Sequence, residues 1–159
     1  MAEVSEIVLV RHGETVENRA GILQGQAPHL GRLNDLGREQ ARRLGVALAG
    51  DRFDRVLVSS LTRARDTAHI ILDCPTDHPR PEPVALDALR EIHLGVLHGG
   101  PSDAWTAISA GDPMAWHPEG GECWRDVQAR VRPFLAEHIY GGPRDRVLVV
   151  AHGGVNKVL

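Results

Sequence analysis

Two arginines and two histidines of this 159-residue chain stand close behind short apolar runs. Arg11 and His12 directly follow the run IVLV, and His152 directly follows the run VLVVA. Arg63 stands shortly after the run VLV at 56–58. A guanidinium group binds phosphate oxygens in a bidentate way, and a neutral imidazole nitrogen can attack phosphorus. These residue types therefore indicate phosphoryl transfer, provided that the fold brings them together.

The elements that must position these residues alternate along the chain. Segments 6–10, 55–60 and 146–152 contain short runs rich in Val and Leu, as expected for strands that are covered on both faces. Segment 83–89 is predicted as a further strand. Helices are predicted between the strands, and this alternation is typical of βαβ units. We therefore expect an α/β fold, a three-layer sandwich in which a mostly parallel sheet carries helices on both faces.

Three helices are predicted from apolar residues that recur at helical spacing. The first runs between Asn34, which can cap its start, and Gly50, which can end it. The second follows Ser60, another possible N-cap, and the third spans 122–139, where Pro133 is expected to introduce a kink. The residues expected to face the core are Ala41, Leu44, Ala47 and Leu48, then Leu61, Ala64, Ala68 and Ile71, and then Trp124, Val127, Val131 and Leu135.

The carboxyl ends of the predicted strands are rich in charged, polar and imidazole groups. The residues at or just after these ends are Arg11, His12, Ser59, Ser60, Arg63, Arg90, Glu91 and His152. Any one of them alone is more simply interpreted as a solvated loop residue. In open α/β sheets, however, ligands bind beyond the carboxyl ends of the strands, where all of these side chains would converge. We therefore expect one shared site at this edge of the sheet.

Arg63 is also placed against a local preference. It lies in the first turn of the predicted second helix, where the positive end of the helix dipole disfavours a cation. Its guanidinium group could simply reach back into water, but a residue that opposes a local preference is often functional. Together with Arg11, it could clamp a planar or tetrahedral anion.

Composition and length limit the class of protein. The 159 residues are enough for one hydrophobic core, and we expect a single catalytic domain over 1–159. A formal net charge of −3 gives no general attraction to nucleic acid or to an anionic membrane, and no segment has transmembrane length. The N-terminus lacks a signal-peptide pattern, and Cys74 and Cys123 are too few for a disulfide framework, so a cytoplasmic protein is predicted.

Five motifs, in order, resemble those of the histidine phosphatase superfamily, which includes cofactor-dependent phosphoglycerate mutases and broad small-molecule phosphatases. They are LVRHGET with Asn18, SSLTRARDTA, LREIHLGVLHG, PEGGECWRDV and VLVVAHGG, and they span nearly the whole chain. The resemblance implies a phosphoglycerate mutase-like fold. It also implies that His12 is the nucleophile that forms a phosphohistidine and that Glu91 is the proton donor.

The same resemblance implies roles for further residues around the substrate. These candidates are Arg11, Arg63 and His152 around the transferred phosphoryl group, Asn18 and Gly153 as further phosphate contacts, and Gln24 and Gly25 in the segment LQG that closes over the substrate.

The expected activity is hydrolysis of a small phosphorylated metabolite by a metal-independent phosphatase that needs no cofactor. Arg11 and Arg63 can neutralise the phosphoryl oxygens, and their positive charge favours the neutral form of the nearby imidazole. The spacing of His93 and His98 could be that of metal ligands, but a solvated loop pair is the simpler interpretation. We therefore expect no metal site.

Two alternatives remain open at this point. A cofactor-dependent phosphoglycerate mutase would need a bisphosphate primer, and the connection 94–120 lacks the long insertion of the glycolytic mutases and is similar to that of the compact phosphatases. A non-catalytic phospholigand-binding module would bind phosphate without turnover. Trp105 and Trp116 in this connection could stack on a substrate, although packing of a cap over the sheet is the simpler interpretation.

The position of Leu159 leads to a last expectation. The chain stops a few residues into the helix expected after VLVVAHGG, whereas members of the family it resembles continue with further strands, one of which pairs beside the first strand. We therefore expect the fold to lack its C-terminal strands, which leaves the apolar segment 6–10 as a sheet edge. Either the sequence is part of a longer protein, or a second copy covers this edge in a homo-oligomer.

Overall fold

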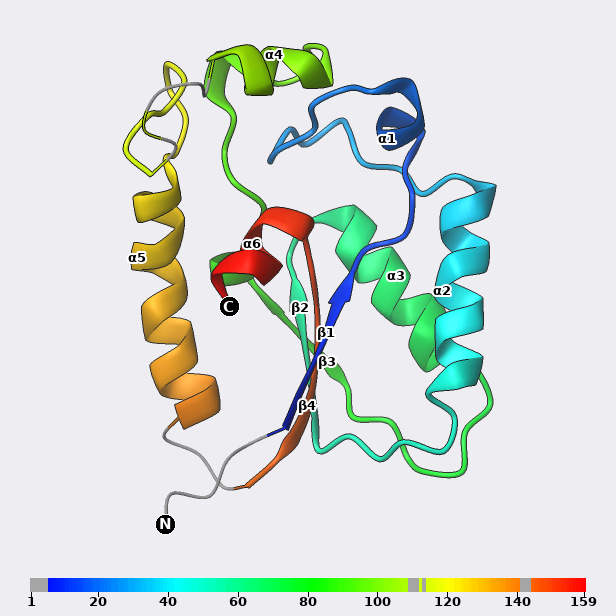
Figure 1. The fold of residues 1–159 in the computed structure, drawn as a ribbon. Helices are drawn as coiled ribbons and strands as arrows, with labels where there is room; N and C mark the ends of the chain where they lie inside the picture. The colour runs from blue at the N-terminus through cyan, green and yellow to red at the C-terminus, as the bar shows by residue number, and fades with distance from the viewer. Residues whose placement is uncertain (1–5, 109–111, 113, 141–143) are drawn as a thin grey trace.

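A four-stranded parallel sheet forms the middle layer of the computed structural model, which describes residues 6–108, 112, 114–140 and 144–159 (Figure 1). The strand order is β1-β4-β2-β3, and every neighbouring pair is parallel. The strands are β1 (Glu6–Arg11), β2 (Arg55–Ser59), β3 (Pro83–Leu86) and β4 (Arg146–Ala151). The register places Arg11 beside Ala151, so the residues that follow β1 and β4 start at the same level of the sheet.

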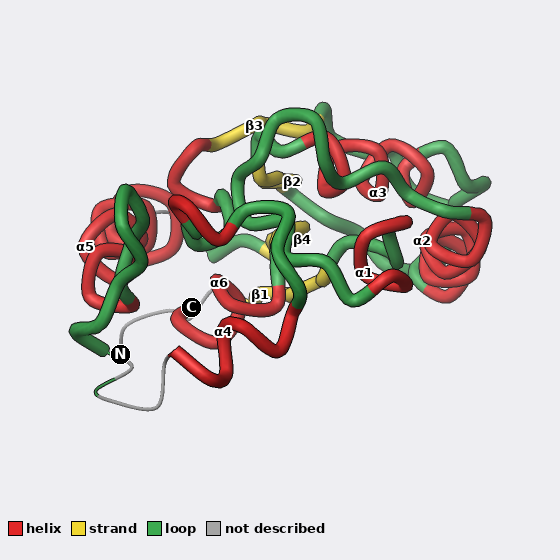
Figure 2. The backbone as a smooth tube through the Cα atoms, turned by 90° about the horizontal axis from the view of Figure 1, so that it is seen from above, coloured by secondary structure: helices red, strands yellow, loops and turns green. Residues whose placement is uncertain are grey.

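Helices cover both faces of this sheet, as the alternating pattern predicted (Figures 1 and 2). Side chains of β4 alternate between the two faces, as a strand requires. On one face, Leu148 and Val150 pack with residues of α3 (Thr62–Leu72), and α2 (Asp35–Ala47) lies beside α3. On the other face, Val147 and Val149 pack with residues of α5 (Trp124–Leu135) and α6 (Gly153–Val158). The three-layer α/β architecture is confirmed.

Short elements connect the layers and gather near the carboxyl ends of the strands. They are α1 (Val16–Ala20), the 3-10 turns η1 (Asp87–Leu89) and η2 (Gly95–Leu97), and α4 (Ser102–Ile108). The π-helical turn η3 (Ala136–Tyr140) lies at the opposite end of the sheet, where the His138 carbonyl accepts a hydrogen bond from Arg55, the first residue of β2. In Figure 1, α1 and α4 lie above the upper ends of β1 and β4, so they form the rim of the space beyond the sheet.

Two helix boundaries differ from the predicted ones. Asn34 does cap α2, because its side chain accepts a hydrogen bond from the Gly37 amide, but the helix ends at Leu48 and not at Gly50. Ser60 does not cap α3: Leu61 occupies the N-cap position without a side-chain bond, while the Ser60 hydroxyl donates to the Asp87 carboxylate. Ser60 therefore ties β2 to η1 instead of starting the helix.

The predicted third strand and third helix are also shorter than expected. Segment 83–89 is a strand only as far as Leu86, after which the chain turns into η1. Helix α5 contains Pro133 and gives way to a π-helical turn after Leu135, consistent with the expected disturbance near this proline. Val127 and Val131 are buried as predicted, but Phe134 is buried more deeply than Leu135.

Strand β1 lies at one edge of the sheet, because its partner among the described residues is β4 alone. Leu9 in this strand is 42% exposed. The prediction that segment 6–10 forms a sheet edge is therefore confirmed for the part of the chain that the structure describes. Within that part, no helix is both long and apolar enough to span a bilayer.

Candidate active site

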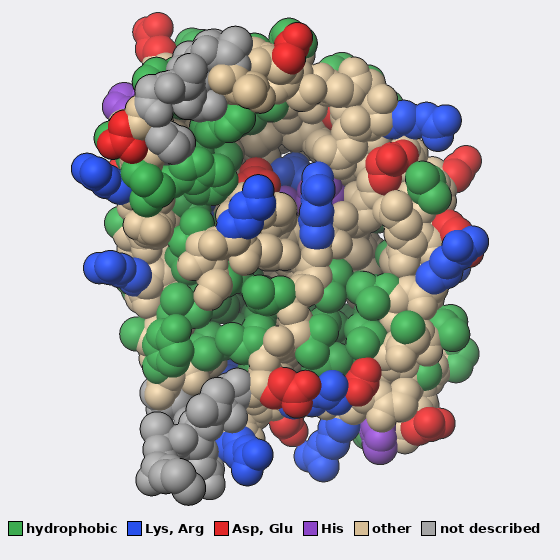
Figure 3. Space-filling model, in the orientation of Figure 1, with side chains coloured by type: hydrophobic (Ala, Val, Ile, Leu, Met, Phe, Trp, Pro, Cys, Tyr) green, Lys and Arg blue, Asp and Glu red, His purple; other side chains and the backbone are tan. Residues whose placement is uncertain are grey.

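A cavity of about 420 Å³ opens beyond the carboxyl ends of the strands. Eight of the nine predicted site residues line it, and these are Arg11, His12, Asn18, Gln24, Gly25, Arg63, Glu91 and Gly153. The ninth, His152, is fully buried, with its ring centroid 5.2 Å from that of His12. Figure 3 shows the cavity as a hollow in the upper half of the molecule, with cationic side chains at its mouth and histidine behind them. The predicted convergence is therefore present.

His12 is held in one orientation at the end of β1. Its amide donates to the Ala151 carbonyl at 3.1 Å, which continues the sheet pairing by one residue. Its Nδ1 lies 2.7 Å from the Gly13 carbonyl oxygen, which can only accept, so the network assigns the ring proton to Nδ1. The Nε2 lone pair is then left as the nucleophile. Burial, reinforced by Arg63, lowers the pKa of His12 to about 3, so the ring is neutral near pH 7.

Arg63 sits in the first turn of α3 and is only 2% exposed. Its Nε donates to His12 Nε2 at 3.2 Å, and its Nη2 donates to the Gly25 carbonyl at 2.8 Å. Burial lowers the pKa of Arg63 to about 10, against the opposing influence of nearby carboxylates, so the guanidinium remains charged near pH 7. The guanidinium thus points into the site and not into water.

Arg11 completes the cationic pair from the last position of β1. It lines the cavity, and within the described residues its side chain makes no ion pair or hydrogen bond. A Cβ atom at Gly153 would lie 3.5 Å from its Nε, so the glycine and the guanidinium are close neighbours. An arginine without a counterion in a cavity is suited to bind an anionic ligand.

His152 occupies the N-cap position of α6, with its ring beside that of His12 and one ring nitrogen unpaired among the described residues. Its Nε2 lies 2.8 Å from Ser59 Oγ, which already accepts a hydrogen bond from the Leu61 amide. The Ser59 hydroxyl can therefore donate to Nε2, which places the imidazole proton on Nδ1. Nδ1 is buried and has no partner among the described residues. Burial, together with Arg63, lowers the pKa of His152 well below its usual value, so this is a neutral ring with a free donor.

Glu91 lies on the other side of the cavity, after η1. Its two carboxylate oxygens accept separate backbone hydrogen bonds, Oε1 from the Ile92 amide at 3.0 Å and Oε2 from the Gly154 amide at 3.2 Å. The side chain is therefore held in place beside the start of α6, where it faces the same cavity as His12.

Asn18, Gln24 and Gly25 also line the cavity. Asn18 forms a capping box with Thr15 through its backbone amide and Oδ1, which leaves its Nδ2 donor free of that box. Gln24 is 7% exposed, and its Oε1 has no partner in the described part of the chain. Gly25 has a positive φ of 46°, and a Cβ there would lie 2.6 Å from His98 Nε2, so glycine is required.

Two residues that support the site were not among the predicted site residues. Thr67 is 1% exposed; its hydroxyl accepts from the Gly13 amide at 3.0 Å and donates to the Arg63 carbonyl at 2.7 Å. Its position four residues after Arg63, on the same helix face, could have revealed it. Ser59 was noted at a strand end, but its link to His152 depends on the pairing of β2 with β4.

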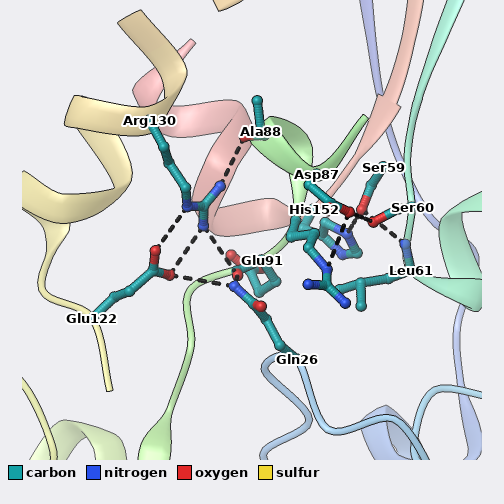
Figure 4. A network of polar contacts seen from close by, with 11 residues as sticks. Gln26, Ser59, Ser60, Leu61, Asp87, Ala88, Glu91, Glu122, Arg130 and His152 are labelled. Atoms are coloured by element: carbon teal, nitrogen blue, oxygen red, sulfur yellow. Dashed lines mark hydrogen bonds and ion pairs between the residues drawn. The ribbon is translucent and has the colours of Figure 1, made fainter. Parts of the chain in front are cut away.

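A partly buried ion pair supports the loop that carries Glu91 (Figure 4). Arg130 Nε donates to Glu122 Oε1 at 2.8 Å, and its Nη groups donate to the carbonyls of Ala88 and Glu91. The side chain of Gln26 donates to the same Glu91 carbonyl at 2.7 Å. This network connects α5, the Glu91 loop and the segment that follows Gln24, and sequence spacing alone did not indicate it.

His93 and His98 are not the solvated pair that was expected. Their rings pack edge to face with centroids 4.6 Å apart. His98 Nε2 accepts from the backbone amides of Gln26 and Leu94, while His93 Nδ1 accepts from the Gly95 amide. The pair therefore fastens loops together. Among the described residues, no group of three or more His, Cys, Asp or Glu side chains is arranged to hold a metal ion.

Comparisons with known proteins agree with this geometry. Residues 7–159 match the family model described as histidine phosphatase superfamily (branch 1). The chain is 35% identical to a metal-independent phosphoserine phosphatase of Arabidopsis thaliana over 99% of this chain and 68% of that protein. It is 33% identical to a 2,3-bisphosphoglycerate-dependent phosphoglycerate mutase of Azorhizobium caulinodans, over 96% and 78%. A solved structure of mycobacterial glucosyl-3-phosphoglycerate phosphatase with VO3 superposes with a TM-score of 0.81 and 32% identity, over 96% and 78%.

Proposed function

The chain belongs to the histidine phosphatase superfamily (branch 1), and we propose from this premise that it hydrolyses a small phosphomonoester through a phosphohistidine at His12, without a metal ion. Its relatives support the assignment as a phosphoric monoester hydrolase. We further propose that the reaction needs no metal ion and that the protein is cytoplasmic. Cys74 and Cys123 are both free thiols, which fits that location.

The observation that carries the proposal is the state of His12. Its Nδ1 is engaged by the Gly13 carbonyl, and its pKa is lowered to about 3, so its Nε2 is unprotonated near pH 7 and accepts a hydrogen bond from Arg63. Around it stand two guanidinium groups and the free Nδ1 donor of His152. A neutral nucleophile inside a cluster of hydrogen-bond donors is what an incoming phosphate dianion requires.

The first step follows from these positions. The phosphoryl oxygens bind Arg11, Arg63 and His152, and Arg63 exchanges its bond to His12 Nε2 for one to the ligand. The Nε2 lone pair then forms a bond to phosphorus while the bond from phosphorus to the ester oxygen breaks.

The second step returns the enzyme to its starting state. Glu91, which became a carboxylate by giving its proton to the alcohol released in the first step, takes a proton from the water that attacks the phosphohistidine. The bond from nitrogen to phosphorus breaks, and inorganic phosphate leaves. No metal ion is needed, because the arginines neutralise the phosphoryl oxygens.

Trapping of the covalent intermediate tests this proposal. The enzyme is mixed with a phosphate-labelled aryl phosphate and denatured in alkali within one turnover. We expect label on the protein that is stable in alkali and lost in acid, as a phosphohistidine requires. It should be absent from His12→Gln and present in the control His69→Gln, whose histidine is exposed on α3. Turnover abolished by EDTA, or label retained in His12→Gln, would contradict the mechanism.

A phosphoglycerate mutase is the second candidate, and one relative with that name supports it. A mutase returns the phosphoryl group to a second alcohol, so 3-phosphoglycerate with a bisphosphate primer would be isomerised faster than it is hydrolysed. Release of inorganic phosphate as the main product supports the phosphatase. Phosphate binding without either reaction would indicate a non-catalytic module.

A further inference from the structure

The cavity has two chemically different halves. Arg11, His12 and Arg63 make up the phosphate half described above. Six apolar side chains also line the cavity, and together they are called the apolar wall: Ile22, Leu23, Ile92, Leu94, Trp105 and Trp124. We propose that this wall binds the alcohol portion of the substrate and that this alcohol is flat and apolar, such as one that carries a fused aromatic ring. The inference rests on the proposed function and adds the substrate class.

The position of Glu91 connects the apolar wall to the reaction. A Cβ atom at Gly154 would collide with Glu91 Oε1 and would lie 2.5 Å from Cη2 of Trp124. The carboxyl group and the indole ring therefore meet over the same glycine. Because Glu91 protonates the leaving oxygen in the proposed reaction, the carbon skeleton attached to that oxygen emerges beside Trp124.

Trp105 and Trp124 form one aromatic surface although they come from different helices. Their ring centroids are 6.4 Å apart at an angle of 85°, and the ring of Trp116 packs on Trp105 with centroids 5.7 Å apart. Both cavity tryptophans are only partly buried, and both also pack on the hydrophobic core. The expectation that Trp105 belongs to a packed cap is therefore met, while its exposed part remains available to a ligand.

The polarity of this wall disfavours a polyhydroxylated alcohol. Beyond the predicted site residues, the polar side chains that line the cavity are Ser102 and Lys157. A sugar hydroxyl group that faces the indole rings would lose water without gaining a hydrogen-bond partner from them. A flat aromatic group loses little on leaving water and can pack against both indole rings.

A pair of substrates with equal leaving groups tests the inference. Ethyl phosphate and 2-(1-naphthyl)ethyl phosphate both release a primary alcohol, so the chemical step is closely matched. We expect kcat/KM for the naphthyl compound to exceed that for ethyl phosphate by at least about tenfold, since the ring is buried only in the complex. Glycerol 3-phosphate should resemble ethyl phosphate. Equal kcat/KM values for all three would overturn the inference.

Tryptophan variants test whether Trp105 and Trp124 cause the preference for the naphthyl substrate. Trp124→Ala and Trp105→Ala should each lower the naphthyl-to-ethyl selectivity ratio by about fivefold or more. Trp116→Ala is the control, because Trp116 packs on Trp105 but does not line the cavity. A ratio unchanged in both cavity variants, or lowered as much in the control, would contradict the assigned wall.

A binding measurement separates this inference from the proposed function. The non-hydrolysable naphthylethylphosphonate and ethylphosphonate are titrated into the wild-type protein by calorimetry. Tighter binding of the naphthyl compound supports the aromatic wall even if neither phosphate ester is hydrolysed, in which case the proposed function fails alone. Hydrolysis of ethyl phosphate without any preference for the naphthyl compounds leaves the function standing and overturns the wall.

Discussion

Arg63 donates a hydrogen bond from Nε to the Nε2 of His12 at 3.2 Å, so the cationic clamp and the proposed nucleophile are in direct contact. The same guanidinium also donates to the Gly25 carbonyl through Nη2. A ligand that draws Arg63 toward its own oxygens therefore frees the attacking lone pair. Binding of the phosphoryl group and activation of the nucleophile are thus coupled through one side chain.

Replacement of Arg63 by lysine should uncouple these events. Arg63→Lys keeps the charge but loses the planar fork that reaches His12 and Gly25 together. We expect kcat/KM to fall by about 10²–10³, the usual loss for removal of one preorganised donor. Steady-state kinetics with an aryl phosphate measure this, with Arg65→Lys as the exposed control on the same helix. A loss below threefold in Arg63→Lys would show that charge alone suffices.

The role of Glu91 can be measured through the leaving group. Glu91→Gln keeps the size of the side chain but cannot transfer a proton. We expect kcat for an alkyl phosphate to fall by about 10² or more, and a smaller loss for 4-nitrophenyl phosphate, whose phenolate leaves without a proton. Equal losses for both substrates would indicate that Glu91 only positions other groups.

The close approach of Gly154 to Glu91 and Trp124 allows a separate test of how these two side chains are placed. Gly154→Ala would bring a methyl group against Glu91 Oε1 and the Trp124 ring. We expect displacement of both side chains, a fall in kcat/KM, and a change in tryptophan fluorescence. Gly50→Ala is the control, because Gly50 has open space around it and its φ is not positive, so this substitution should leave activity unchanged.

Buried neutral histidines should make the fold sensitive to mild acid. Burial lowers the pKa values of His12 and His152, so the unfolded chain binds protons near pH 6 that the folded chain does not. Stability is therefore fully present above pH 6.5 and declines as the pH falls toward the folded-state values. Each such histidine adds up to about 1.4 kcal/mol per pH unit to the slope.

Urea unfolding between pH 7 and pH 5 measures this slope, above the range where carboxylates dominate. His12→Gln should lower the slope of the unfolding free energy against pH by up to about 1.4 kcal/mol per pH unit, because it removes one group whose pKa differs between the two states. An identical slope in His12→Gln and wild type would mean that His12 titrates equally in both states.

His98 should fasten the segment that carries Gln24 and Gly25. Its Nε2 accepts from the amides of Gln26 and Leu94 at 3.1 Å and 3.2 Å. His98→Phe leaves these donors without an acceptor, at a cost of about 1–3 kcal/mol for each that stays buried. We expect faster hydrogen exchange at both amides and a higher KM. Unchanged exchange in His98→Phe, compared with the exposed control His69→Phe, would contradict this role.

The secondary-structure elements were predicted more accurately than the residues at which they begin and end. Short Val- and Leu-rich runs predicted β1, β2 and β4, and helical spacing predicted most of the buried face of α3, because strand and helix periods are local properties. Local signals were less reliable at element ends. Ser60 is of a residue type that often caps helices, but its hydroxyl group donates to Asp87 instead. Gly50 is of a residue type that often ends helices, but α2 ends two residues earlier, at Leu48.

The sequence by itself determined the family, the α/β class and the residues at the strand ends, since each follows from residue type and order along the chain. Only the tertiary structure decided what those residues can do. The contact of His12 Nε2 with Arg63, the unused Nδ1 of His152 and the shared contact of Glu91 and Trp124 over Gly154 depend on distances between segments far apart in the chain. Hydrogen-bond direction and burial act through space, so no spacing along the sequence could have specified them.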